Sequence, residues 1–295
     1  MANFMGVEFP DCPKVLHLES SILCNARCIF CPTPRLILDK TRPIYMDEKI
    51  WKHVLDQVAT QRVERMSPFL NGEPFIDPQL LDIVRYCKKV SPLTVISIYT
   101  NACAMTKEKA NAAIEAGVTY FHFSLGGYSR AVYERTQPCL EYNQSIANVR
   151  QFIELVRGYS GVRYAIGMTT TIDNQSELDV FKRFWKSQGA YDVEGNAVTN
   201  RDQESFVAGV YDTDRSRQSD KPCMSMLFDH FYVLTNGDVV MCCEDWSGKV
   251  VVGNVVEESV KDIWLGSRMN EVRRIHLEGA KKEIKGLCDN CVVVH

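Results

Sequence analysis

Three cysteines stand close together in the stretch Cys24-Asn25-Ala26-Arg27-Cys28-Ile29-Phe30-Cys31, which is followed at once by Pro32. The spacing is C-x3-C-x2-C. Three thiolates leave a four-iron cluster one ligand short, so the remaining iron is free to bind a substrate or cofactor. A structural zinc site would need a fourth ligand, and the nearest candidate, His17, falls in a predicted strand. The spacing therefore favours an iron–sulfur site, with zinc as the alternative.

The composition is that of an ordinary globular chain. Its 295 residues are enough for one large domain, or for one with a small appendage. A net charge of −3 gives no sign of a nucleic-acid groove or of binding to an anionic membrane. No apolar run approaches the roughly 18 residues of a membrane span, and residues 1–13 do not resemble a signal peptide. We therefore expect neither nucleic acid nor membrane among the partners.

The number of cysteines points to a reducing compartment. Twelve cysteines are many for a chain of this size. A disulfide framework is typical of short secreted chains, so metal or cluster ligation is the better interpretation here. We expect a cytoplasmic location.

Strand and helix patterns alternate over the first two thirds of the chain, after an irregular lead-in at residues 1–13. β-branched or alternating stretches predict strands at 15–19, 66–70, 94–99, 120–125, 162–172 and 193–198. Apolar periodicity predicts helices at 46–60, from 77 onward, and at 106–116, 145–157 and 176–188. This order indicates an α/β fold, a parallel sheet with outer helices that curls into a partial (β/α)6 barrel. Functional residues should then lie at the carboxyl ends of the strands.

The pattern changes after about residue 201. Residues 202–221 are polar and predict a linker or surface loop. Two short strands, 231–234 and 239–242, flank Asn236-Gly237, a strong hairpin signal. A helix is expected at 259–276, with Ser259 as its cap. We therefore expect a barrel domain at 14–215 and a small α+β iron–sulfur domain at 216–295.

A second set of cysteines belongs to this C-terminal part: Cys223, Cys242, Cys288 and Cys291. Four thiolates suit a closed [4Fe–4S] cluster, and they equally suit a zinc site made of four cysteines. Cys243 stands beside Cys242. Because neighbouring side chains on a strand point to opposite faces, only one of the two should reach the other ligands.

The first cysteine motif, with an aromatic residue before its third cysteine, resembles that of the radical S-adenosylmethionine (SAM) superfamily. The resemblance implies a [4Fe–4S] cluster on Cys24, Cys28 and Cys31 whose open iron chelates SAM. Reduction then cleaves SAM to a 5′-deoxyadenosyl radical, which removes hydrogen from a substrate. It also implies a low-potential electron donor such as flavodoxin or ferredoxin.

The C-terminal part resembles the "twitch" form of the SPASM domain, in which a G-x4-C hairpin, a helix and a terminal C-x2-C hold one auxiliary [4Fe–4S] cluster. The spacing from Gly237 matches Cys242 to that pattern, and the reverse assignment to Cys243 stays open. The overall layout is similar to that of an aminocyclitol dehydrogenase of the superfamily.

The resemblance also implies which residues contact SAM. Asn71 stands where the GGEP element of the family usually begins with glycine, and Gly126 stands where the family often has Asp. Arg135 could equally be an ordinary residue of a helix surface. The implied cofactor-binding residues are Phe30, Gly72, Glu73, Pro74, Asn101, Ser124 and Arg135.

Three outcomes of the radical chemistry fit the residues. The substrate could be oxidised, with a charged residue as base and the second cluster as electron acceptor. It could be epimerised, with Cys139 or Cys243 returning a hydrogen. It could instead be a peptide, although only about fourteen residues precede the first strand. Our hypothesis is oxidation or epimerisation of a small polar molecule, such as a sugar, aminocyclitol or nucleoside. A zinc- or cluster-stabilised binding protein without radical chemistry is the alternative. His53, His122, His230 and His276 are interpreted as structural.

Overall fold

The computed structural model describes residues 1–295 except 41, 62, 198–220, 290 and 292–295. All six predicted strands of the barrel are present and run parallel in chain order. They are β3 (Val15–Leu18), β4 (Arg65–Ser67), β5 (Val95–Thr100), β6 (Val118–Leu125), β7 (Arg163–Thr170) and β8 (Val193–Ala197). The partial barrel predicted from the sequence is confirmed.

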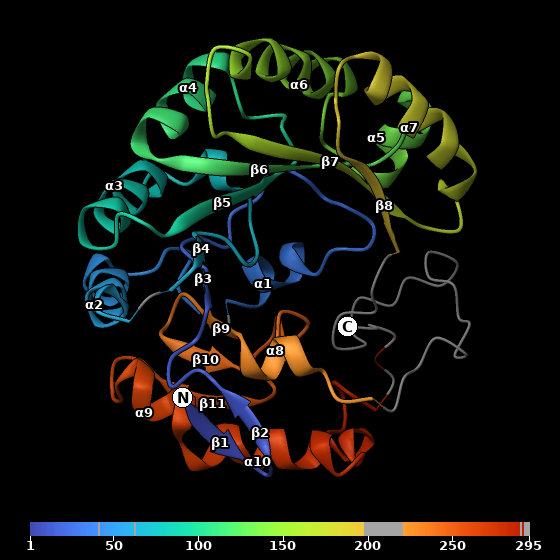
Figure 1. Ribbon diagram of the computed structural model, residues 1–295. Coiled ribbons are helices and arrows are strands. Elements are labelled where there is room, and N and C mark those ends of the chain that lie inside the picture. The colour runs from blue at the N-terminus through green and yellow to red at the C-terminus, as the bar shows by residue number, and fades with distance from the viewer. Residues whose placement is uncertain (41, 62, 198–220, 290, 292–295) are drawn as a thin grey trace.

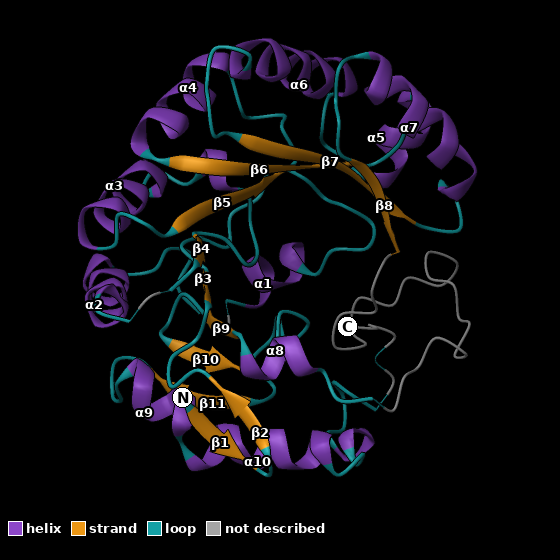
Figure 2. Ribbon diagram, in the orientation of Figure 1, coloured by secondary structure: helices purple, strands orange, loops and turns teal. Residues whose placement is uncertain are grey.

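Helices cover the convex side of this sheet (Figures 1 and 2). They are α2 (Glu48–Ala59), α3 (Leu80–Val90), α4 (Lys107–Ala116), α6 (Tyr142–Val156) and α7 (Leu178–Ser187). Each buries an apolar stripe; in α2 the stripe is Trp51, Val54, Leu55 and Val58. α4 ends at Gly117, whose φ of +120° suits glycine and whose N–H bonds the carbonyl of Ala113. Within the described residues, no helix has the length and apolarity to cross a bilayer.

The pleat of the strands separates an apolar convex face from a polar concave face. In β6, Phe121 and Phe123 are fully buried and pack against Phe152 of α6. The alternate residues Tyr120, His122 and Ser124 point the other way. The concave side of the barrel therefore carries hydrogen-bonding groups, while the core lies between sheet and helices.

The C-terminal strands extend the same sheet. β9 (His230–Val233) pairs in parallel with β3, and it is followed by antiparallel β10 (Asp238–Val240) and β11 (Val251–Asn254). The described residues form one nine-stranded sheet in the order β11-β10-β9-β3-β4-β5-β6-β7-β8. The predicted hairpin at Asn236-Gly237 is confirmed, with Gly237 at φ +88°. α8 (Met224–Phe228) precedes it.

Several local predictions were wrong. The lead-in is a hairpin of β1 (Ala2–Phe4) and β2 (Val7–Phe9), too short to show alternation. The helix expected at 259–276 is broken by the extended Gly266 into α9 (Val260–Leu265) and α10 (Ser267–Leu277). The strand expected at 239–242 ends at Val240, so Cys242 and Cys243 lie in the following turn. Ser259 does cap its helix.

Some short elements were not predicted. In the described residues they are α1 (Thr33–Asp39), α5 (Arg130–Thr136) and the 3-10 turns η1 (Pro74–Ile76) and η5 (Lys281–Glu283), whereas the 3-10 turn η2 (Gln175–Glu177) begins the helix predicted at 176–188. One or two helical turns carry too little periodicity to be recognised. α1 lies between the barrel strands and the C-terminal hairpin, where Leu36 packs against Ile22 and Trp246 (Figure 1). Most of the linker predicted at 202–221 lies outside the described residues, as does the domain boundary at 215/216.

Candidate functional site

The loop that follows β3 gathers the first three cysteines. Burial raises the pKa of the Cys28 thiol well above its ordinary value, and the nearby thiols of Cys31 and Cys24 raise it further. The backbone N–H of Ala26 donates to Cys24 Sγ at 3.4 Å. The three thiols therefore lie near one another, as a shared cluster requires.

The end of α5 and the residues after it hold this loop in place. The N–H groups of Arg27 and Ile29 donate to the carbonyls of Pro138 and Thr136 at 2.9 and 3.1 Å. Between these two residues, Gln137 donates from Nε2 to the carbonyl of Ser124 at 3.1 Å. Gln137 also explains Gly126, because a Cβ at that position would lie 2.9 Å from its side chain. The cysteine loop and the end of β6 are thus joined through one residue.

Glu73 connects the loop after β4 and the end of β5 to the cysteine loop through hydrogen bonds. Its backbone N–H bonds the carbonyl of Leu23 at 2.6 Å, directly before the cysteines. Its buried carboxylate accepts from Thr100 Oγ1 at 2.6 Å and from the N–H of Asn101 at 2.8 Å. Asn101 in turn donates from Nδ2 to Asn25 Oδ1 at 2.9 Å, inside the cysteine motif. The motifs at the ends of β3, β4 and β5 therefore converge.

The glycine of this element is sterically required. Gly72 has a φ of +88°, and a Cβ there would lie 2.6 Å from the carbonyl oxygen of Ser21 and 2.7 Å from that of Leu23. No side chain fits between these two backbones. Pro74 then opens η1. Gly72 lets the loop after β4 lie against the loop that carries the cysteines.

Asn71, which replaces the usual first glycine, belongs to a buried ionic network. Its amide donates to Glu19 Oε1 at 2.6 Å. Arg42 binds both oxygens of Glu19 at 2.7 Å and donates from Nη1 to the carbonyl of Trp246 at 2.8 Å. The N–H of Thr235 bonds Glu19 Oε2 at 3.1 Å. The network joins the motif loops to the C-terminal hairpin.

The second cysteine set is gathered by segments distant in the sequence. Burial raises the pKa of the Cys288 thiol to about 12, and the nearby thiols of Cys291 and Cys223 contribute. Burial also raises the pKa of Cys242 well above its ordinary value, with further contributions from the Cys243 and Cys288 thiols. The four predicted ligands, Cys223, Cys242, Cys288 and Cys291, therefore lie near one another.

Cys242 and Cys243 point to different surroundings. Both pack against the cluster of Leu70 and Tyr232, but Cys242 also packs against the main core, which Cys243 does not. Burial raises the pKa of the Tyr232 hydroxyl, and the Cys243 thiol beside it adds to that shift. Cys243 is therefore on the concave side of the sheet. The cysteine whose pKa the Cys288 thiol raises is Cys242. The strand β10, which was expected to turn the two cysteines to opposite faces, ends before both of them.

The number of thiols in each set suits an iron–sulfur cluster. Three thiolates leave one iron of a four-iron cluster open, and four thiolates fill a closed cluster. His17, the alternative zinc ligand, instead lies with its Nε2 3.0 Å from His230 Nδ1. The residues fit one cluster with an open iron and one closed cluster.

A polar group that the sequence interpretation missed lies on the concave face. His122 Nε2 is 2.9 Å from Glu194 Oε1 on β8, and its Nδ1 is 3.3 Å from Ser124 Oγ. The hydrogen bond with His122 lowers the pKa of Glu194 to about 2. Gly167 of β7 lies between the pair, and a Cβ there would be 2.7 Å from the imidazole. The alternation of polar and aromatic residues in 120–125 was the available signal.

Two predicted residues are exposed beside the loop. Arg135 lies on the surface of α5, and Cys139 follows the segment that binds the cysteine loop, with a φ of +72°. Phe30 is half-buried within the loop itself. Their assigned roles stay predictions.

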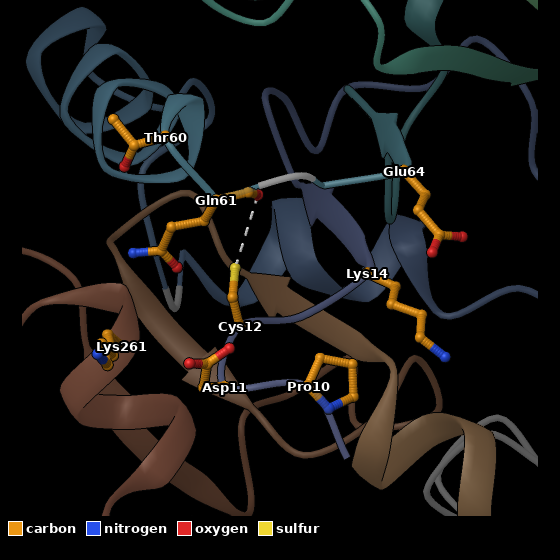
Figure 3. Close-up of a pocket in the computed structure, with 8 residues that line it drawn as sticks. All are labelled: Pro10, Asp11, Cys12, Lys14, Thr60, Gln61, Glu64 and Lys261. Atoms are coloured by element: carbon orange, nitrogen blue, oxygen red, sulfur yellow. Dashed lines mark hydrogen bonds between the residues drawn. The ribbon is translucent and has the colours of Figure 1, made fainter. Parts of the chain in front are cut away.

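A pocket at the opposite end of the barrel lacks these features. Its volume is about 440 Å³, and it lies where β3 and β4 begin, between Lys14, Glu64 and Cys12 (Figure 3). Burial raises the pKa of Cys12 to about 12, which makes its thiol a poor nucleophile. The motifs lie at the carboxyl ends of the strands, so we place the functional site there.

Both cysteine sets lie in regions that match known protein families. Residues 18–180 match the radical SAM superfamily, and residues 223–292 match the SPASM iron–sulfur cluster-binding domain. The chain is 23% identical to the S-adenosyl-L-methionine-dependent 2-deoxy-scyllo-inosamine dehydrogenase of Niallia circulans. That match covers 94% of this chain and 92% of the dehydrogenase.

Solved structures share the fold. BtrN in complex with AdoMet and 2-DOIA superposes with a TM-score of 0.64 at 21% identity, over 95% of this chain and 93% of that one. Streptococcus suis SuiB bound to its precursor peptide SuiA gives a TM-score of 0.72 at 14% identity, over 90% of this chain and 67% of SuiB. At these identities the likeness concerns the fold.

Proposed function

The chain belongs to the radical SAM superfamily, and from that premise we propose that it oxidises or epimerises a small polar metabolite such as an aminocyclitol, sugar or nucleoside. When bound, SAM and the reduced [4Fe–4S] cluster supply a 5′-deoxyadenosyl radical that removes hydrogen from the substrate. The SPASM match adds an auxiliary iron–sulfur cluster. The chain's similarity to an aminocyclitol dehydrogenase over nearly its whole length supports the choice of substrate class.

The observation that carries the proposal is the polar concave face beside the motif loops. A polyol presents several hydroxyl groups, and each needs a hydrogen-bond partner when water is excluded. His122, Glu194 and Ser124 form a hydrogen-bonded row on this face. Tyr99 extends the row, with its ring centroid 5.1 Å from that of His122. A peptide with apolar side chains would find few matching groups on these residues.

His122 is suited to accept the proton that a hydroxyl loses when its carbon is oxidised. Its Nε2 faces the carboxylate of Glu194, which fixes the ring, and Nδ1 is the nitrogen left to take the proton. The side chain of His122 is only 10% exposed, and its hydrogen-bond partners Glu194 and Ser124 hold the orientation of the ring. We assign His122 as general base and Glu194 as its orienting partner.

Epimerisation would need a hydrogen donor instead of a base. Cys243 suits that role better than Cys139, because Cys243 lies with Tyr232 on the concave side while Cys139 is exposed. A Cys243→Ala variant that still forms oxidised product would exclude the epimerase form of the proposal.

The residues keep their proposed roles in cofactor binding. Cys24, Cys28 and Cys31 would hold the SAM cluster, and Cys223, Cys242, Cys288 and Cys291 the auxiliary one. The loops at Gly72–Pro74, Asn101 and Ser124, with Phe30 and Arg135, would bind SAM. We further propose a domain boundary near 215/216, a cytoplasmic location and a flavodoxin or ferredoxin as electron donor.

The test is anaerobic incubation of reconstituted protein with SAM, a reductant and single candidate substrates. The panel contains 2-deoxy-scyllo-inosamine, other aminocyclitols, sugars and nucleosides, and short peptides as the alternative class. We expect 5′-deoxyadenosine to form in proportion to substrate for a polar small molecule. His122→Gln should lower the yield of oxidised product about 10² to 10⁴-fold, the usual contribution of a general base. Turnover confined to peptides would overturn the proposal.

A further inference from the structure

The geometry points to His276 as a residue that tunes the auxiliary cluster: we propose that its Nε2–H donates a hydrogen bond to the Cys288 thiolate and raises the reduction potential of that cluster. The inference rests on the auxiliary cluster, and it does not depend on which substrate the enzyme takes. His276 is not a proposed ligand, because the four cysteines already supply four thiolates.

His276 lies between two members of the ligand set. It occupies the last turn of α10 and is fully buried. Its Nδ1 accepts from the backbone N–H of Cys223 at 3.4 Å, and its Nε2 lies 3.7 Å from Cys288 Sγ. One imidazole thus contacts the first and third cysteines of the set through opposite ring nitrogens.

These two contacts determine where the proton resides. A ring nitrogen that accepts a backbone N–H cannot itself carry hydrogen, so Nδ1 is unprotonated. The hydrogen of the neutral ring is then on Nε2, directed at Cys288. With a thiolate as acceptor, this contact is a charge-assisted hydrogen bond from a fully buried imidazole.

The sign of the effect follows from electrostatics. Reduction adds one negative charge to the cluster and its thiolates. An N–H dipole pointing at a ligand sulfur stabilises the more negative state, so it favours reduction. An auxiliary cluster with a raised potential is a better electron acceptor, which is the property that substrate oxidation requires.

The experiment uses the full chain with Cys24→Ala/Cys28→Ala/Cys31→Ala, which leaves one cluster of about four irons. Its midpoint potential is measured by anaerobic redox titration followed by electron paramagnetic resonance. Three substitutions separate the contacts of His276. His276→Leu removes both, His276→Asn keeps an acceptor for the Cys223 N–H, and His276→Gln keeps a donor for Cys288. His53→Gln, at an exposed histidine on α2, is the matched control.

We expect His276→Leu and His276→Asn to lower the ratio of reduced to oxidised cluster about tenfold at a fixed solution potential, equivalent to about 59 mV for one electron. His276→Gln and His53→Gln should remain near the parent value. Equal potentials in all variants would overturn the proposal. A potential near the parent value in His276→Asn but not in His276→Gln would also overturn it. So would loss of all iron from the parent protein with the three cysteine substitutions, or a ¹⁴N coupling in the spectrum that shows His276 bonded directly to iron. Failure of the substrate panel would leave these potentials unaffected.

Discussion

At the scale of single residues, the site depends on buried charges that are fully paired. Glu19 and Arg42 are both buried and form an ion pair. Glu19 also accepts from Asn71 and from the N–H of Thr235, and Arg42 also donates to the carbonyl of Trp246. All carboxylate oxygens and guanidinium nitrogens of the pair therefore have partners. Removing one partner of such a pair leaves the other charge buried without compensation. Asn71 is therefore a structural substitute for the family glycine, since its amide completes this network.

We predict that Arg42→Ala lowers the free energy of unfolding by about 3–5 kcal/mol, because it leaves the Glu19 carboxylate buried without its cationic partner. Urea denaturation under anaerobic conditions measures the change. Arg274→Ala is the matched control, since Arg274 pairs with Glu271 and Glu278 on the surface of α10. Exposed pairs contribute little, so the control should unfold at the parent urea concentration. Equal behaviour of the two variants would argue against a structural role for the network.

At the scale of elements, three neighbouring strands build the polar row. His122 comes from β6 and Glu194 from β8, so the imidazole must cross over β7. Gly167 makes the crossing possible, because it leaves the space that any side chain would fill. The site on the concave face thus requires a residue that carries no functional group.

We predict that Gly167→Ala displaces the His122 ring from Glu194 while the protein still folds, since the obstructed atoms belong to the tip of a side chain. A displacement near 1 Å is expected to cost about 10²-fold in kcat/KM. The measurement uses the substrate identified by 5′-deoxyadenosine formation, with the iron content as a check on folding. Gly158→Ala is the control, because its Cβ would meet only an ordinary contact at 3.6 Å. Unchanged kcat/KM in Gly167→Ala would remove His122 from the mechanism.

At the scale of the whole molecule, the two cysteine sets are parts of one sheet. β3, which delivers the first cysteine loop, is hydrogen-bonded to β4 on one side and to β9 of the C-terminal part on the other. Phe231 and Val233 of β9 belong to the same apolar core as Leu16 and Leu18 of β3. The barrel edge is therefore completed by the region that carries the second cysteine set.

We predict that a chain ending at residue 215 will not form a stable barrel. Without β9, the strand β3 would be an unpaired sheet edge, and the apolar side chains of Leu16 and Leu18 would lose their cover from Phe231 and Val233. Both changes favour aggregation. Size-exclusion chromatography after expression with and without co-expressed residues 216–295 measures this. A monomeric chain 1–215 that reconstitutes about four irons would show that the barrel folds independently, in accord with a separable domain.

The sequence by itself determined the class of the fold and supplied the two proposed ligand sets. Cysteine spacing and strand–helix periodicity are local properties, so Cys24, Cys28, Cys31 and the six barrel strands could be found without coordinates. Contacts between distant segments could not be found in this way. The pairing of β9 with β3, the reach of His122 across Gly167 to Glu194, and the contact of His276 with Cys223 each join residues separated by dozens of positions. Only the tertiary structure decides such contacts, because they depend on how whole elements pack and not on the residues that neighbour them in the chain.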